Sequence, residues 1–248
     1  ESSIARDSNF VLPIHCGPEI GVASTKAFLG QILILYMFAL KLGSLRNEIE
    51  NKIYQAKIKD LKNLPSLIEK TLLIDNDIQA IASTFNEAKG SMFLGRGFSY
   101  PIALEGALKL KELSYVHAEG YPAGEMKHGP LALIEEGMPV VVLAPRDSYY
   151  KKTISNMQEV IARGAKVLLI TNKSKDEVFS ENIWETVLVE SANDDLLPFL
   201  LTVPLQKLAY YSALKKGYDI DKPRNLAKSV TVEWPFVKNL KIHLYQRR

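Results

Sequence analysis

Three short runs of apolar, often β-branched residues constrain the fold of this 248-residue chain more than any other feature. They are SMFLGRG at 91–97, PVVVLAP at 139–145 and KVLLITN at 166–172. Their apolar residues do not alternate with polar ones, which is typical of strands covered on both faces. Helical patterns separate the runs, near 101–115 and 148–163. We therefore expect a doubly wound α/β domain, with a parallel sheet between two helical layers, over residues 91–217.

The two ends of the chain resemble each other. Residues 9–43 and 182–217 each read as a strand, a loop and a long apolar helix, with NFVLPIH as the first predicted strand and NIWETVLV as the second. At a separation of 210 − 36 = 174 positions, the identical pairs are Tyr36/Tyr210, Ala39/Ala213, Leu40/Leu214, Lys41/Lys215 and Gly43/Gly217. We interpret residues 1–43 as the C-terminal remnant of a first copy of the domain, in a chain that is a fragment.

The rest of the chain divides by charge. Residues 44–90 are rich in Lys, Glu and Asp at helical spacing, which predicts solvent-lined linker helices packed on the second domain, residues 91–233. Residues 234–248 form an atypical basic extension with four Lys or Arg and no acid. The net charge is +3, so residues 1–233 carry 3 − 4 = −1. A nearly neutral body gives no indication of nucleic-acid binding.

The longest apolar run, AFLGQILILYMFALKLG at 27–43, raises the question of a membrane span. It contains Gln31 and Lys41 and falls short of the ~18–20 apolar residues that a span needs, so we expect a buried core helix. No basic stretch followed by an apolar core is visible near residue 1. The single Cys16 excludes an internal disulfide and fits a reducing compartment. We therefore predict that the protein is cytoplasmic and does not contact a membrane.

Candidate chemistry begins at the helix that follows Gly95-Arg96-Gly97. Glycines at a helix start let an anion approach, but tight strand-to-helix turns use them without any ligand about as often. In the helix, Glu105, Lys109 and Glu112 fall at i, i+4 and i+7 and share one face. This face could be solvated, with one Glu–Lys pair, or it could hold a carboxylate near a cation for proton transfer beside a carbonyl.

Two further groups lie in segments without clear periodicity. His128 sits in HAEGYPAGEMKHGP, which reads as an irregular loop, and it fits an exposed donor, a core hydrogen-bonding group or an acid–base group. Lys228 lies in KPRNLAKSVTVE, as either a solvated lysine or an amine that forms a Schiff base with a sugar carbonyl. His117, Glu119, Glu125 and His128 lack the spacing of a helical metal-binding pair, so we expect no metal.

Four strings together resemble the isomerase region of the glucosamine-6-phosphate synthase family, the isomerizing glutamine–fructose-6-phosphate aminotransferases. They are CGPEIGVASTKAF, FLGRGFSYPIALEGALKLKELSY, HAEGYPAGEMKHGPLALI and DKPRNLAKSVTVE, and the resemblance covers residues 1–233. It implies two tandem sugar-isomerase (SIS) domains, each a three-layer α/β/α unit. The implied reaction converts fructose 6-phosphate and glutamine-derived ammonia to glucosamine 6-phosphate for amino-sugar synthesis.

The resemblance also assigns site residues. Lys228 matches the lysine that opens or captures the sugar as an imine, Glu112 the base that moves a proton between C1 and C2, and His128 a ring-opening histidine that reaches the site from the other subunit of a homodimer. The implied substrate contacts, with Glu19 beside them, are Val22, Ser24, Glu105, Lys109 and Ala227. This chemistry requires no metal or organic cofactor.

The chain departs from the family pattern at both ends. A glutaminase domain and the Ser- and Thr-rich loop that grips the sugar phosphate are absent, so Cys16 is expected to be a structural thiol. The family usually stops at Glu233, and the extension beyond it could obstruct the surroundings of Lys228. Two other interpretations of the same domain stay open, a fructosamine-phosphate deglycase and a non-catalytic sugar-phosphate-binding module. A degenerate fragment without function is a further one.

Overall fold

A five-stranded parallel sheet forms the centre of the protein in a computed structural model, which describes residues 2–173 and 182–228. The strands are β1 (Ser91–Gly95), β2 (Ala118–Pro122), β3 (Pro139–Leu143), β4 (Lys166–Asn172) and β5 (Glu185–Val189). Their order across the sheet is β2-β1-β3-β4-β5, and every pair is parallel. The three apolar runs and the strand predicted in 182–189 are confirmed, and so is the doubly wound α/β class.

Strand β2 corrects the expectation of an irregular loop over HAEGYPAGEMKHGP. Residues Ala118 to Pro122 pair in register with β1, so main-chain hydrogen bonds to a neighbouring strand give this polar segment its structure. Gly120 permits the close approach of helix α5 (Ser99–Ser114) to this strand, since a Cβ on Gly120 would lie 2.9 Å from the Cα of Leu104. Neither condition is visible in the local sequence.

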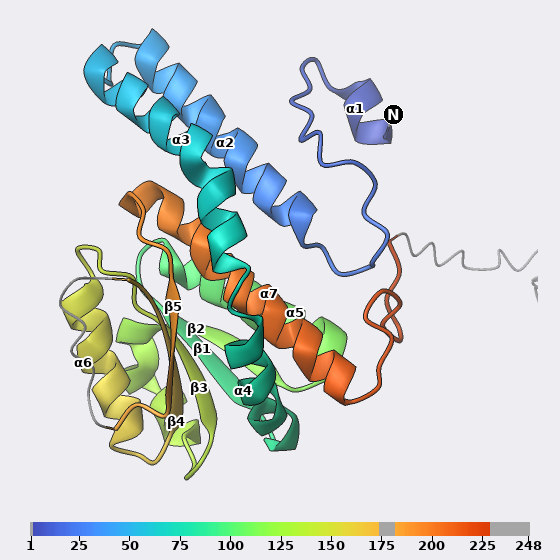
Figure 1. Cartoon of the computed structure of the whole chain (residues 1–248), viewed down its shortest axis with the longest axis vertical. Coiled ribbons are helices and arrows are strands. Elements are labelled where there is room, and N and C mark those ends of the chain that lie inside the picture. Colours follow the sequence, from blue (N-terminus) through green and yellow to red (C-terminus); the bar gives the residue numbers. More distant parts are fainter. Residues whose placement is uncertain (1, 174–181, 229–248) are drawn as a thin grey trace, which may run out of the picture.

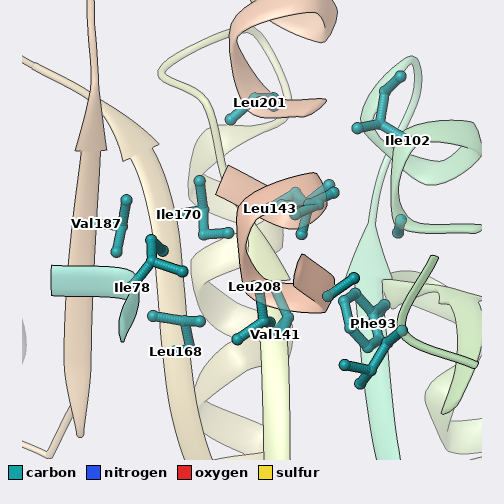
Figure 2. Close-up of a cluster of buried hydrophobic side chains, with 14 of the residues drawn as sticks. Ile78, Phe93, Ile102, Val141, Leu143, Leu168, Ile170, Val187, Leu201 and Leu208 are labelled. Atoms are coloured by element: carbon teal, nitrogen blue, oxygen red, sulfur yellow. The ribbon is translucent and has the colours of Figure 1, made fainter. Parts of the chain in front are cut away.

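Alternate residues of the strands face two separate apolar cores. Phe93, Val141 and Leu168 are in register with one another and point to the face covered by three helices, α4 (Asp75–Glu87), α5 (Ser99–Ser114) and α7 (Leu197–Lys215). Figure 2 shows this core, with side chains from the strands meeting those of the helices. Helix α6 (Tyr150–Ile161) and the 3₁₀ helix η1 (Ala123–His128) cover the opposite face. The two layers explain why the strands carry no polar alternation.

Helices α2 (Lys26–Leu45) and α3 (Asn51–Thr71) form a helical hairpin that projects from the α7 side of the domain (Figure 1). The helix predicted in 27–43 is present, but its expected burial is wrong: only Leu40 is buried, while Leu35, Phe38 and Leu45 are 62%, 51% and 67% exposed. In the described part of the chain, α2 alone is long and apolar enough to cross a membrane by length and composition. Within residues 44–90 the structure has helices α3 and α4, and both contact α7.

The remaining elements are short. They are α1 (Ser3–Asp7), η2 (Pro130–Leu133) and η3 (Asp194–Leu196). The prediction of a strand in NFVLPIH is wrong. Residues 8–24 form neither helix nor strand, and none of the five strands of the described sheet pairs with them. The predictions for the segment after Lys228, including Glu233 and the basic extension 234–248, lie outside the described residues.

Candidate functional site

Helix α5 presents the predicted charged face, and most of it is covered. The Nζ of Lys109 lies 2.5 Å from an Oε of Glu112 and 3.6 Å from an Oε of Glu105. The Lys109 side chain is only 3% exposed, and those of Glu105 and Glu112 are 9% and 22% exposed. The simple interpretation as a solvated surface pair is therefore wrong, because one buried cation is shared between two carboxylates.

Glu105 is the most perturbed acid of this face. Burial raises the pKa of Glu105 to about 7, the Lys109 charge opposes that rise, and the Glu112 charge adds to it. The Oε1 of Glu105 has no hydrogen-bond partner among the described residues. A carboxyl group with such a pKa can hold or release a proton near neutral pH, which is a property that proton-transfer sites use.

Glu19 links the start of α2 to the lysine that follows α7. Its Oε1 accepts hydrogen bonds from the backbone N–H groups of Thr25, at 2.7 Å, and Ala27, at 3.4 Å, so it caps the start of α2. Its other carboxylate oxygen lies 3.2 Å from the Nζ of Lys228. Burial raises the pKa of Glu19, but the hydrogen bonds from Thr25 and Lys228 outweigh that effect and lower it overall. Lys228 therefore has a fixed anionic partner.

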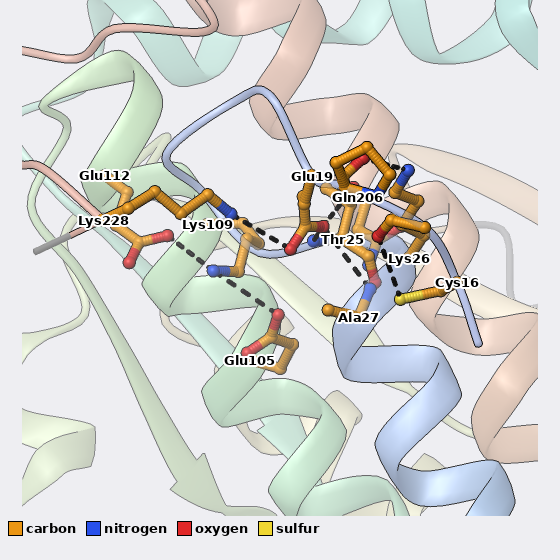
Figure 3. A network of polar contacts seen from close by, with 12 residues as sticks. Cys16, Glu19, Thr25, Lys26, Ala27, Glu105, Lys109, Glu112, Gln206 and Lys228 are labelled. Atoms are coloured by element: carbon orange, nitrogen blue, oxygen red, sulfur yellow. Dashed lines mark hydrogen bonds and ion pairs between the residues drawn. The ribbon is translucent and has the colours of Figure 1, made fainter. Parts of the chain in front are cut away.

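Two cavities lie where these segments meet. One, of about 390 Å³, is lined by Glu112 and Tyr115 of the α5 end and by the segment 224–226. The other, of about 350 Å³, has Glu19, Leu113 and Asp221 among its walls. The backbone N–H of Val22 donates to the carbonyl of Asp221 at 2.9 Å, which ties the two loops together. Figure 3 shows the polar groups arriving from the loop before α2, from α5 and from the segment after α7.

The structure brings together four of the predicted site residues. Lys109 contacts Glu105 and Glu112, and Lys228 contacts Glu19, and Figure 3 draws both sets of contacts. Val22 and Ser24 lie half-buried in the loop that carries Glu19, and Ala227 is exposed beside Lys228.

His128 is the predicted catalytic residue that neither set of contacts includes. It ends η1, its side chain is 75% exposed, and its charged neighbour is Glu125 at 3.8 Å. Within residues 2–173 and 182–228, the ion pairs and hydrogen bonds of the same chain therefore do not join His128 to Glu112 or Lys228.

The Gly95-Arg96-Gly97 turn has a conformational explanation. A Cβ on Gly95 would lie 2.4 Å from the carbonyl oxygen of Ser99, and Gly97 has a φ of +52°. These glycines are thus required by the tight entry into α5, whether or not a ligand binds there. In the part of the chain that the structure describes, no three His, Cys, Asp or Glu side chains are grouped as metal ligands would be.

The sequence places Glu19 only beside the implied substrate contacts, and its role at Lys228 is visible in the structure alone. The partnership of Glu19 with Lys228 spans 209 positions. The local signal was an acid shortly before the helix start at Thr25-Lys26, which fits a capping role and reveals nothing about a distant amine.

Several known proteins are similar to this chain. A model of the SIS domain matches residues 84–216. The chain is 48% identical over 233 residues to a "Glutamine--fructose-6-phosphate aminotransferase [isomerizing]" of Bartonella henselae, which covers 94% of this chain and 38% of that protein. A protein of the same name from Rhizobium meliloti is also 48% identical, with the same two coverages. This chain thus spans well under half the length of these relatives.

Solved structures are similar to this chain as well. The C-terminal domain of glucosamine-fructose-6-phosphate aminotransferase from Francisella tularensis superposes with a TM-score of 0.86 at 44% identity, over 89% of this chain and 62% of that one. A glucosamine-6-phosphate deaminase from Thermotoga maritima gives a TM-score of 0.67 at 26% identity, over 92% of this chain and 63% of that one.

Proposed function

The chain belongs to the SIS domain family, and from this premise we propose that it is the isomerase part of an isomerizing glutamine–fructose-6-phosphate aminotransferase. In this proposal it binds fructose 6-phosphate and contributes to the formation of glucosamine 6-phosphate. The observation that carries the proposal is the ion pair between Lys228 and Glu19, which lies next to the cavities at the C-terminal end of α5, where Glu112 is.

The proposed chemistry starts at the amine. The neutral form of Lys228 attacks the C2 carbonyl of the open-chain ketose, and loss of water gives an imine. Ammonia then displaces the lysine and leaves a C2 imine of its own. Glu19, which is hydrogen-bonded to Lys228, fixes where the amine points and can take up a proton that it releases.

The isomerisation needs one carboxylate on one face of the substrate. Glu112 removes a proton from C1, the electron pair forms a C1–C2 double bond, and the imine nitrogen is protonated. The proton then returns to C2 while the C1 hydroxyl gives up its own proton, which balances the proton taken up by the nitrogen, and C1 becomes the aldehyde of the amino sugar. Lys109 donates a hydrogen bond to Glu112 and fixes the direction of this carboxylate, and Glu105 is the neighbouring acid whose pKa of about 7 lets it exchange protons with the site.

The exposed His128 supports a second part of the proposal, a homodimer in which this histidine acts across the interface. Its side chain is 75% exposed and lies outside the network of its own chain, so a partner's site is open to it. In that arrangement His128 assists ring opening of the sugar bound by the partner. We further propose a cytoplasmic location, in line with the single free Cys16.

Reductive trapping tests the imine. The chain is incubated with fructose 6-phosphate and cyanoborohydride, and its intact mass is measured. We expect a single sugar-phosphate adduct that is lost in Lys228→Ala and kept in the matched control Lys222→Ala, whose lysine is exposed in the same segment. An adduct that survives Lys228→Ala, or none on the folded wild type, overturns the assignment of Lys228.

A separate assay tests the base. The chain is incubated with fructose 6-phosphate in D₂O, and incorporation of deuterium at C1 is followed by NMR. Glu112→Gln should abolish the exchange while leaving the trapped adduct, because the amide cannot accept the proton. Equal exchange in the variant and the wild type would remove Glu112 from its proposed role.

The deaminase among the solved structures favours a second candidate, an enzyme that releases ammonia from an amino-sugar phosphate. The two directions are distinguished by supplying glucosamine 6-phosphate alone and measuring ammonia, against fructose 6-phosphate plus ammonium and measuring the amino sugar.

A further inference from the structure

Helix α5 ends in an unusual way, just after the charged face. Its C-cap residue is Tyr115, which has a left-handed backbone with a φ of 59°. Such positions favour Gly or Asn, because a bulky side chain is strained there. Helix α7 follows the usual pattern, with Gly217 at a φ of 69° directly after its C-cap. A tyrosine at the end of α5 therefore needs a reason outside the helix.

The Tyr115 side chain reaches the segment that leads to Lys228. Its hydroxyl accepts a hydrogen bond from the backbone N–H of Arg224 at 2.7 Å. The Arg224 guanidinium lies 4.2 Å from the centre of the Tyr115 ring. The ring of Tyr218 also packs in this cluster, with its centroid 4.8 Å from that of Tyr115. One side chain thus contacts the backbone and two side chains of the segment between α7 and Lys228.

These contacts connect the two reacting groups of the proposed mechanism. Glu112 precedes Tyr115 by three residues on the same helix end, and Lys228 follows Arg224 by four residues. Four extended residues span at most ~14 Å, so the position of Arg224 limits where the Lys228 amine can go. Glu19 holds the amine itself, at 3.2 Å. The segment is therefore held at three points: by Tyr115, which moves with the Glu112 helix, by Glu19, and by the hydrogen bond from Val22 to Asp221.

We propose that Tyr115 is a positioning residue, which clamps residues 219–228 to the end of α5 and so sets the distance between the Lys228 amine and the Glu112 carboxylate. This inference rests on the proposed function for its chemical consequence, whereas the clamp itself is a property of the chain without sugar. Within the described residues, the hydrogen bonds and ring contacts of Tyr115 go to neither reacting group, and it acts through Arg224.

Two variants separate the clamp from folding. Tyr115→Asn removes the ring but suits the left-handed backbone, so the helix end is expected to form. Tyr115→Phe keeps the ring under Arg224 and removes only the hydrogen-bond acceptor. The matched control is Tyr218→Phe in the same cluster, since the Tyr218 hydroxyl makes no hydrogen bond among the described residues.

The sugar-free readout is amide hydrogen exchange, measured by mass spectrometry. We expect exchange of residues 219–228 to speed up about tenfold or more in Tyr115→Asn, by less in Tyr115→Phe and not at all in Tyr218→Phe, while α6 on the other face of the sheet stays unchanged. Unchanged exchange of 219–228 in both Tyr115 variants overturns the clamp, whether or not an adduct forms in the trapping assay.

The chemical readout is the dependence of reductive trapping on fructose 6-phosphate concentration. A lost clamp should lower the maximal trapping rate, by about fivefold or more in Tyr115→Asn, and change the half-saturating concentration less. Faster exchange with an unchanged trapping rate would make Tyr115 merely structural and overturn its positioning role.

If the folded wild type gives no adduct, the proposed function fails and the clamp is judged on the amine alone. Trace acetylation then compares Lys228 with the exposed Lys52 of α3. The Lys228: Lys52 labelling ratio should rise in Tyr115→Asn and stay constant in Tyr218→Phe. An unchanged ratio in Tyr115→Asn rejects positioning of the amine.

Discussion

Replacing Glu105 by glutamine tests the electrostatics of the buried α5 face. Burial raises the pKa of Glu105 from 4.5 to about 7, with Lys109 opposing and Glu112 adding to the rise. The unfolded chain therefore loses this proton near pH 4.5, whereas the folded chain keeps it until about pH 7. Over that window the folded state binds more protons than the unfolded state, so stability falls as the pH rises.

The size of the effect follows from the same pKa difference. One pKa unit corresponds to about 1.4 kcal/mol, so the contribution of Glu105 to stability is complete below pH 4.5 and is about 3 kcal/mol smaller above pH 7. The amide introduced by Glu105→Gln resembles the protonated acid at every pH. The free energy of unfolding of the wild type minus that of Glu105→Gln should therefore fall by about 3 kcal/mol across the window.

Urea unfolding at pH 4, 5, 6, 7 and 8 measures this difference. Any constant effect of the amide cancels, because only the change with pH is compared. The control is Glu69→Gln on α3, where the side chain is exposed and its surroundings change little on unfolding, so its difference from the wild type should stay constant. A flat difference for Glu105→Gln, or one that rises with pH, would refute the reasoning. A rise would mean that attraction to Lys109 outweighs burial.

Three further outcomes can be measured by urea unfolding at neutral pH unless stated otherwise. Gly106→Ala should destabilise the fold by about 1–3 kcal/mol, since the new Cβ would lie 2.8 Å from a methyl of Leu205 and force α5 and α7 apart; an unchanged midpoint would contradict this. Ile78→Ala should cost about 2–5 kcal/mol because the side chain is fully buried, and a loss below about 1 kcal/mol would show that the core closes around the gap. Burial raises the pKa of Asp195, but hydrogen bonds from Lys57 and Tyr36 outweigh burial and lower this pKa overall. Asp195→Asn should therefore lower the free energy of unfolding by about 1–3 kcal/mol at pH 7, and this loss should shrink as the pH falls below 3.8. A loss that is independent of pH would contradict the charge-based explanation.

Local sequence patterns predict much of the fold. The apolar runs of β1, β3 and β4 predict strands covered on both faces, because a strand in the centre of a doubly wound sheet has no face in water. Helical spacing likewise placed Glu105, Lys109 and Glu112 on one face of α5, since the α-helical repeat depends only on sequence separation.

Other features depend on what lies beside a segment. Strand β2 exists because the edge of β1 supplies hydrogen-bond partners to a Gly- and Pro-rich stretch. NFVLPIH has similar strand-forming residues and no neighbouring strand of the described sheet, so it stays irregular. Helix α2 is only partly buried: side chains such as Phe28 and Ile32 pack against the core, whereas side chains such as Leu35 and Phe38 find no such partner among the described residues.

The sequence alone determined strands β1, β3, β4 and β5, the charged face of α5 and the family resemblance that pointed to Lys228 and Glu112. The tertiary structure alone decided that Lys109 is buried between two carboxylates, that Glu19 holds Lys228, and that Tyr115 holds Arg224. The physical reason is that periodicity specifies which side chains share a face, whereas contacts between residues far apart in the chain arise only when packed elements bring their loops together.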